Sequence, residues 1–147
     1  KMKSCLLLAS VLLASVAASA GQNEDMIACA KAGDLACVQS AIRAGADINA
    51  RTSDGGDTAL MWAALWGRTE VARFLIESGA NVNLKNNYGY TALIDASIYG
   101  YTDIVVLLIG AKADLDIVSD NNGTALLYAK QKGHTAIVEI LKAAGAK

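Results

Sequence analysis

Four side chains in this sequence could carry chemistry, namely Cys29, Cys37, Asp95 and His134. A pair of thiols can form a disulfide, whereas a carboxylate or an imidazole can transfer protons or bind a metal ion. His134 is the only histidine, and no cluster of cysteines or carboxylates accompanies it at the spacing of metal ligands. The sequence also contains no nucleophile elbow, glycine-rich phosphate loop or paired-acid arrangement. It therefore predicts no catalytic centre, no metal site and no cofactor, and we expect the protein not to be an enzyme.

The elements that position these side chains repeat along the chain. Glycines that each follow a short helical pattern recur 34, 33 and 33 residues apart, at Gly33, Gly67, Gly100 and Gly133. A Thr-Ala-Leu triplet opens the pattern in three of the repeats, at Thr58, Thr91 and Thr124. Threonine is a good helix N-cap, and glycine ends a helix with a tight turn. After each glycine, apolar residues at helical spacing predict a second helix, so the period indicates stacked helix-turn-helix units.

The stretch from Thr58 to Asn83, TALMWAALWGRTEVARFLIESGANVN, closely resembles the ankyrin-repeat consensus. The resemblance covers nearly all of the chain after residue 20, with a degenerate start in the first repeat. It implies an all-α repeat fold, an α-solenoid of four stacked ankyrin repeats whose helix-turn-helix units are joined by β-hairpin-like turns. The expected repeats span approximately 21–53, 54–86, 87–119 and 120–147.

Several positions depart from the consensus. Alanine replaces the proline usual after the opening threonine, and the histidine usual two residues later is Met61, Ile94 or Leu127, so its hydrogen bonds are expected to be missing. Lys112 stands where other repeats have glycine, and a left-handed backbone there would cost about 1 kcal/mol. Asn122 replaces a turn glycine, which asparagine tolerates.

Residues 1–20 have the layout of a secretory signal peptide. Lys1 and Lys3 precede an apolar run over 6–17, and the small residues Ala18-Ser19-Ala20 then match the A-x-A cleavage pattern. We expect cleavage after Ala20, leaving an ankyrin-repeat domain over 21–147 with 11 basic and 14 acidic residues and a net charge of −3. An N-terminal membrane anchor is the alternative, but the run is short for a membrane span. The mildly acidic domain indicates neither nucleic-acid nor membrane binding once the signal is removed.

Cys29 and Cys37 are the two cysteines that would remain, because Cys5 lies in the predicted signal. Alignment of the repeat glycines places Cys29 in the first helix of its repeat and Cys37 in the second, facing each other across the turn. Export favours oxidised thiols, so we predict a disulfide that stabilises the N-terminal repeat by about 2 to 3 kcal/mol. Two reduced core cysteines are the alternative.

Ankyrin arrays are overwhelmingly protein-binding modules, and the resemblance implies the same here. The two residues before each repeat glycine are expected to face a partner, as are the turn tips and the residue after the glycine. Gln131 and Lys132 share this placement in the last repeat. In the two central repeats these positions are mostly large and apolar or aromatic, which is typical of interface hot spots. The predicted partner-binding residues are Asp57, Leu65, Trp66, Arg68, Tyr88, Tyr90, Ile98, Tyr99 and Tyr101.

Two side chains near this face have structural interpretations that we favour. Trp62 lies one turn earlier in its helix than Trp66, and we expect it to pack between repeats. Asp95 aligns with Trp62 and Tyr128 of the adjacent repeats. A carboxylate between aromatic rings could have a raised pKa and a functional role. We expect instead that a neighbouring hydroxyl, that of Tyr128, satisfies it, just as His134 occupies a position where the family's histidine is structural.

The resemblance to small exported bacterial ankyrin proteins implies a periplasmic protein that binds another protein and is monomeric when unbound. The leading hypothesis is a self-protection inhibitor that caps an exported enzyme, plausibly a cell-wall (peptidoglycan) peptidase. An accessory factor of a periplasmic enzyme such as a catalase is one alternative. A secreted effector or adaptor that engages a host protein is another. A hydrolase using Asp95 or His134 is the least favoured.

Overall fold

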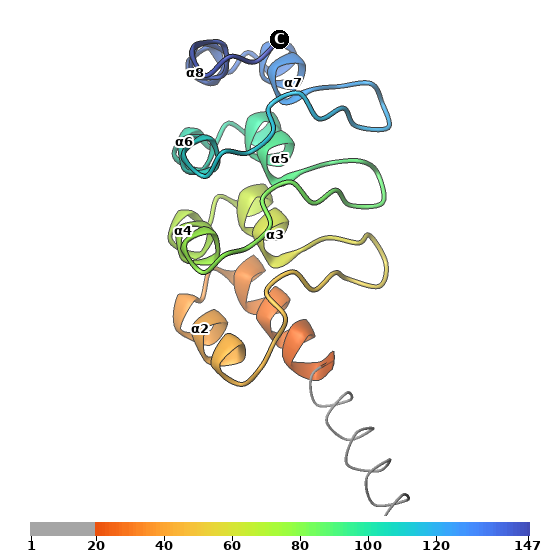
Figure 1. The fold of residues 1–147 in the computed structure, drawn as a ribbon, viewed down its shortest axis with the longest axis vertical. Coiled ribbons are helices and arrows are strands. Elements are labelled where there is room, and N and C mark those ends of the chain that lie inside the picture. Colours follow the sequence, from red (N-terminus) through yellow and green to blue (C-terminus); the bar gives the residue numbers. More distant parts are fainter. Residues whose placement is uncertain (1–19) are drawn as a thin grey trace, which may run out of the picture.

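The structure, a computed structural model, describes residues 20–147 as a stack of four helical hairpins (Figure 1). The predicted signal peptide lies outside the described residues apart from Ala20. The first hairpin consists of helical residues 20–32 and α2. The later hairpins are α3 with α4, α5 with α6, and α7 with α8. The bounds of the helices are α2 Leu35–Arg43, α3 Ala59–Trp66, α4 Thr69–Glu77, α5 Ala92–Tyr99, α6 Thr102–Gly110, α7 Ala125–Lys132 and α8 Thr135–Ala143.

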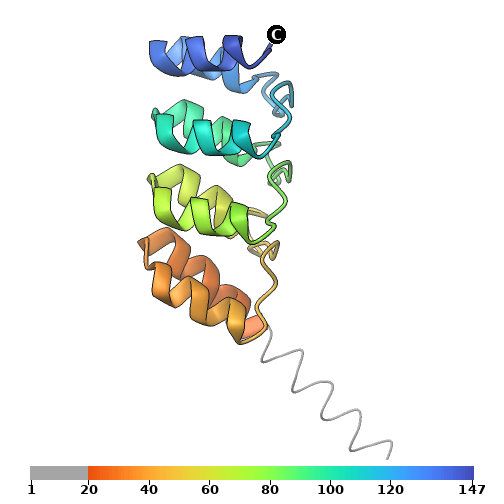
Figure 2. The same ribbon diagram turned by 60° about the vertical axis from the view of Figure 1, so that its left-hand side comes forward.

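The helices form two rows along the stack. The inner row contains α3, α5 and α7, and the outer row contains α2, α4, α6 and α8, each packed on the next repeat (Figures 1 and 2). Alanines at one position of the inner row, Ala63, Ala96 and Ala129, are completely buried, so the helices can approach closely. Leucines Leu60 and Leu93 fill the space between repeats. This all-helical solenoid confirms the predicted fold class, because each hairpin buries its apolar face against its neighbours.

The predicted helix caps are present. The hydroxyl groups of Thr58, Thr91 and Thr124 each accept a hydrogen bond from the backbone N–H three residues later. Gly67, Gly100 and Gly133 end the inner helices in the left-handed conformation. Met61, which replaces the usual histidine, makes a contact of its own in this turn. Its Sδ accepts a hydrogen bond from the Thr58 N–H at 3.5 Å.

Lys112 and Asn122, which stand where other repeats have glycine, have φ values of 63° and 59°, so both adopt the left-handed backbone. The long loops between hairpins project from one side of the stack (Figure 1). Within residues 20–147 their β pairing is limited to one isolated antiparallel bridge, between Arg51 and Thr58. Backbone bonds link neighbouring loops, from Asn87 N–H to the Gly55 carbonyl at 2.9 Å and onward through the next repeat. The loops are therefore linked to one another along the stack.

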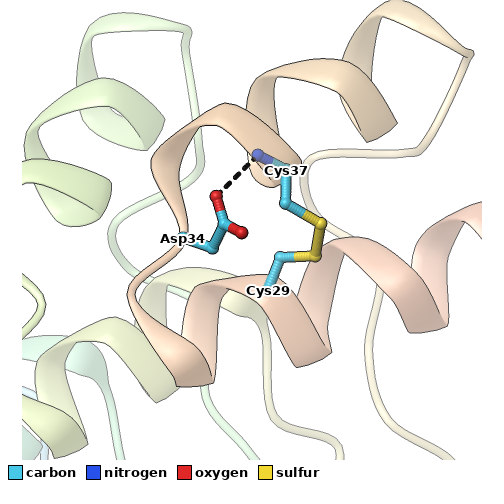
Figure 3. The surroundings of a disulfide bond; sticks show 3 residues. All are labelled: Cys29, Asp34 and Cys37. Carbon is cyan, nitrogen blue, oxygen red and sulfur yellow. Dashed lines mark hydrogen bonds between the residues drawn. A yellow bond between two sulfur atoms is a disulfide. The ribbon is translucent and has the colours of Figure 1, made fainter.

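Cys29 and Cys37 form a disulfide between the two helices of the first hairpin (Figure 3). Their Cα atoms lie 5.8 Å apart, within the usual range for such a bond. Asp34 caps α2, and its carboxylate accepts a hydrogen bond from the Cys37 N–H at 3.0 Å. The pairing is the one that alignment of the repeat glycines predicts. In the described part of the chain, no helix has the length and apolar character needed to cross a bilayer.

Candidate partner-binding groove

The inner helices and the loops before them enclose a groove of about 460 Å³. Five of the nine predicted partner-binding residues line it, namely Asp57, Leu65, Tyr90, Ile98 and Tyr99. They come together because α3, α5 and α7 pack side by side and each contributes residues from one face to the groove. The other lining residues are Met61, Trp62, Asn86, Asp95, Tyr128, Gln131 and Lys132.

Large aromatic side chains stand exposed along this face. Tyr99 is 54% exposed at the rim of the groove, and Trp66 is 48% exposed at the end of α3. Tyr88 is 59% exposed on its loop, outside the residues that line the groove. Exposed aromatic rings have a large area to bury at little entropic cost, so they are typical of binding hot spots. The exposure of Trp66 and Tyr99 is what a binding role requires.

Arg68 and Tyr101 have a second role that sequence reasoning missed. Both lie outside the groove and contact the preceding repeat. Arg68 Nε donates a hydrogen bond to the Lys31 carbonyl at 3.1 Å, and its side chain crosses Gly33. The ring of Tyr101 lies against Gly67, where a Cβ would collide with it. These contacts tie adjacent repeats together, while the binding role of the two residues stays a prediction.

His134 repeats the same arrangement one unit later. Its Nε2 lies 2.9 Å from the Ile98 carbonyl, and its ring covers Gly100. All four repeat glycines have a positive φ, and at Gly33, Gly67 and Gly100 a Cβ would also collide with the side chain from the next repeat, whereas Gly133 has open space around it. The imidazole therefore links α8 to the preceding repeat, as the structural interpretation of this histidine expected.

One wall of the groove is a network of aromatic and polar side chains. The rings of Tyr90 and Tyr128 meet edge to face, with their centroids 5.9 Å apart. The hydroxyl of Tyr128 lies 2.9 Å from Ser119 Oγ, and that of Tyr90 accepts a hydrogen bond from Asn121 Nδ2 at 3.2 Å. Tyr90 is thus bonded to the loop of the following repeat and Tyr128, on α7, to the loop that precedes its helix, which holds both rings in place on the groove wall.

Asp95 lies on α5 among these aromatic residues and is only 7% exposed. The sequence predicted a hydrogen bond with the Tyr128 hydroxyl, and this expectation was wrong: that hydroxyl is bonded to Ser119, and no hydrogen bond joins it to Asp95 in the described residues. Within residues 20–147 the Asp95 carboxyl has no hydrogen-bond partner. Burial raises the pKa of Asp95 to about 8, and repulsion from the Asp57 carboxylate adds to the shift. The carboxyl is therefore mostly protonated at neutral pH.

Trp62 is half-buried between repeats, as expected, but it also lines the groove. Lys31 Nζ lies 4.5 Å from the centroid of its ring, a cation–π contact. Its buried Nε1–H has no acceptor in the described part of the chain. Trp62 also lines a second hollow of about 520 Å³, together with Lys31, Arg51 and Asp54.

The match to known proteins agrees with this architecture. A family model described as "Ankyrin repeats (3 copies)" matches residues 26–119, which is more than half of the chain. The chain belongs to the ankyrin-repeat family. The fourth repeat, with α7 and α8, lies beyond the matched residues but has the same helix caps and turn. Over residues 20–147 the structure thus contains four ankyrin hairpins, one more than the three copies in the family description.

Curated relatives share the repeat over part of their length. The chain is 41% identical over 64 residues to "Dauer abnormal formation protein 25" of Caenorhabditis elegans, covering 44% of this chain and 16% of that protein. It is 40% identical over 58 residues to "Ankyrin repeat and SAM domain-containing protein 6" of Rattus norvegicus, covering 40% and 7%. For "Myotrophin" of Xenopus tropicalis the identity is 39% over 59 residues, covering 40% and 49%. The chain therefore spans half or less of the length of these relatives.

Ankyrin repeats are protein-interaction modules, so this ankyrin-repeat chain is a protein-binding module. Five of the nine predicted partner-binding residues gather in the groove between its loops and inner helices. Repeat position alone placed those five on this face, and their binding role stays a prediction. Sequence reasoning missed Asn86, whose Nδ2 donates to Asp57 Oδ1 at 2.8 Å and fixes that carboxylate at the groove. Within residues 20–147 no group of three or more metal-ligating side chains comes together.

Proposed function

We propose that this ankyrin-repeat protein acts in the bacterial envelope by capping a partner protein, and that the partner is an exported peptidoglycan peptidase which it inhibits for self-protection. The observation that carries the proposal is the groove with exposed Trp66 and Tyr99 beside it. Surfaces of this kind lose water readily and dominate the free energy of protein association. The signal-like residues 1–20 supply the expected location.

Inhibition suits the geometry of the groove. An inhibitor has only to occupy a surface that its target needs, and it requires no chemistry of its own. The groove is fixed by caps, buried alanines and loop-to-loop hydrogen bonds, so little order has to be gained on binding. Such preorganisation lowers the entropic cost of association.

The test is a capture experiment followed by an enzyme assay. The full chain, with a C-terminal tag, is expressed in a bacterium and recovered from the envelope fraction beside a Trp66→Ala, Tyr99→Ala double variant. We expect the wild type to retain an exported peptidase and, at equimolar ratio, to abolish most of its activity on peptidoglycan. The double variant should lose both effects. A wild-type protein that leaves every retained or candidate peptidase fully active would contradict the proposal.

The same material distinguishes the alternatives. Retention of a catalase whose activity is preserved or raised would support an accessory role instead. Recovery of the protein from the culture medium and not from the periplasm would favour a secreted effector. Mass spectrometry of the recovered chain tests export directly, because cleavage after Ala20 removes residues 1–20.

A further inference from the structure

We propose that the groove accepts an arginine side chain of the partner protein, whose guanidinium pairs with the carboxylate of Asp95 among the groove's aromatic rings. The inference rests on the proposed function in assuming that this groove binds a protein. It goes further by naming the chemistry that the partner must present.

The first observation is that Asp95 differs from the other buried polar residues in the described part of the chain. Thr58 and Thr91 cap helices, Ser97 Oγ donates to the Leu93 carbonyl at 2.7 Å, and Ser119 contacts Tyr128. Each of these has a partner, whereas the Asp95 carboxyl forms no hydrogen bond to another group within residues 20–147. The fully buried side-chain atom without a partner in these residues is Trp62 Nε1, so the Asp95 oxygens stay open to the groove that they line. A partner for this carboxyl therefore fits in the groove without any change in the repeat stack.

The second observation is the sign of the charge. Asp57 lines the same groove, and its carboxylate repels that of Asp95. A cation placed in the groove would offset the desolvation of Asp95 and this repulsion together. The lining cation is Lys132, which is exposed at the end of α7 and forms no ion pair with Asp95. Two carboxyl groups therefore line the groove without an ion pair in the described residues, and a positively charged side chain complements them.

The third observation is the aromatic lining, which favours arginine over lysine. Tyr90, Tyr99, Tyr128 and Trp62 all border the groove. The ring of Trp62 already interacts with one cation, the ammonium of Lys31 at 4.5 Å. A guanidinium is planar, stacks on aromatic rings and can donate two hydrogen bonds to one carboxylate, whereas an ammonium is compact and strongly hydrated. A groove of about 460 Å³ also has room for the residues flanking the arginine.

Binding of this kind is linked to pH. Asp95 must lose its proton to pair with the guanidinium, and its pKa in the free protein is about 8. The ionised fraction then rises roughly 25-fold between pH 6.5 and pH 8.5, and the association constant should rise with it. The other titratable or charged groups that line the groove are Asp57 before α3, Tyr90 and Tyr99 flanking and ending α5, and Tyr128 and Lys132 on α7.

The probe is the peptide acetyl-Gly-Arg-Gly-amide, titrated up to 50 mM into the full chain and followed by backbone amide NMR. We expect saturable shifts at Asp95 and Tyr99, with an association constant about 25-fold higher at pH 8.5 than at pH 6.5. The Asp95→Asn variant should lose these shifts, and Asp103→Asn, which removes an exposed carboxylate from α6, should keep them. The same peptide with citrulline, a neutral isostere of arginine, should not bind, and the lysine peptide should bind more weakly.

Three results would overturn the inference. They are equal binding of the citrulline peptide, unchanged binding by Asp95→Asn, and absence of saturable shifts at the groove at pH 8.5. Stronger binding of the lysine peptide would refute the choice of arginine. Because the peptide titration needs no natural partner, its outcome is independent of the capture experiment. Peptide binding without inhibition of any peptidase would leave the groove chemistry standing and would refute the proposed function.

Discussion

Replacement of Asp95 by asparagine should raise the stability of the protein relative to the wild type as the pH rises. The carboxyl is buried against aromatic rings and has no hydrogen-bond partner in the described residues, so its charged form is poorly solvated in the folded state. Its pKa is raised from the ordinary 3.8 to about 8, first by burial and then by Asp57. Asparagine has nearly the same shape and cannot ionise, which isolates this one effect.

The sign and size follow from proton linkage. Between pH 3.8 and pH 8 the folded protein keeps a proton on Asp95 that the unfolded chain releases. The free energy of unfolding of the wild type therefore falls with rising pH over this window, by about 1.4 kcal/mol per pH unit. Above the folded-state pKa the loss stops growing. From pH 4.5 to pH 7.5 the loss is about 4 kcal/mol, a large share of the stability of a small domain.

Urea denaturation of both proteins at one-unit steps from pH 4.5 to 8.5, followed by circular dichroism, measures the difference. With a urea dependence of about 2 kcal/mol per molar, the midpoint of Asp95→Asn should gain about 2 M on the wild type between pH 4.5 and 7.5. The control is Asp103→Asn, because an exposed carboxylate has no desolvation cost and should show no such widening gap. Parallel pH profiles for the wild type and Asp95→Asn would refute the argument from burial.

Three further predictions follow from the repeat geometry. Lys112→Gly should stabilise the protein by about 0.5 to 1 kcal/mol because it relieves a left-handed backbone, whereas Lys112→Ala should give no gain in the same thermal or urea denaturation. Reduction of the Cys29–Cys37 disulfide should cost about 2 to 3 kcal/mol, and alkylation of the unreduced protein should add no mass at either cysteine. The Trp66→Ala, Tyr99→Ala variant should weaken partner binding at least 30-fold with little change in unfolding temperature, since both side chains are half exposed and each hot-spot truncation costs more than about 1 kcal/mol. Unchanged affinity, measured by calorimetry, would show that the partner binds another face.

The sequence predicts most of this fold because each ankyrin unit signals its own boundaries. Thr58 and Gly67 mark the two ends of one helix through local hydrogen bonding and backbone conformation, and both signals recur with the period. The same register placed Leu65 and Tyr99 at the groove. It did not reveal the roles of Arg68 and Tyr101, because their contacts are with glycines of the preceding repeat and depend on how one hairpin lies over the next.

Asp95 shows why the chemistry of the groove was harder to predict than its position. The spacing of residues could not show whether the Tyr128 hydroxyl bonds to Asp95 or to Ser119. Only the fold decides which of the two it contacts, and the contact is with Ser119. The outcome leaves a carboxyl that contributes no internal contact and costs about 4 kcal/mol at neutral pH. An apolar residue at this position would remove that cost. A side chain that weakens the fold while lining the binding surface is best explained by what it contacts in the complex, because strain of this kind concentrates at functional sites.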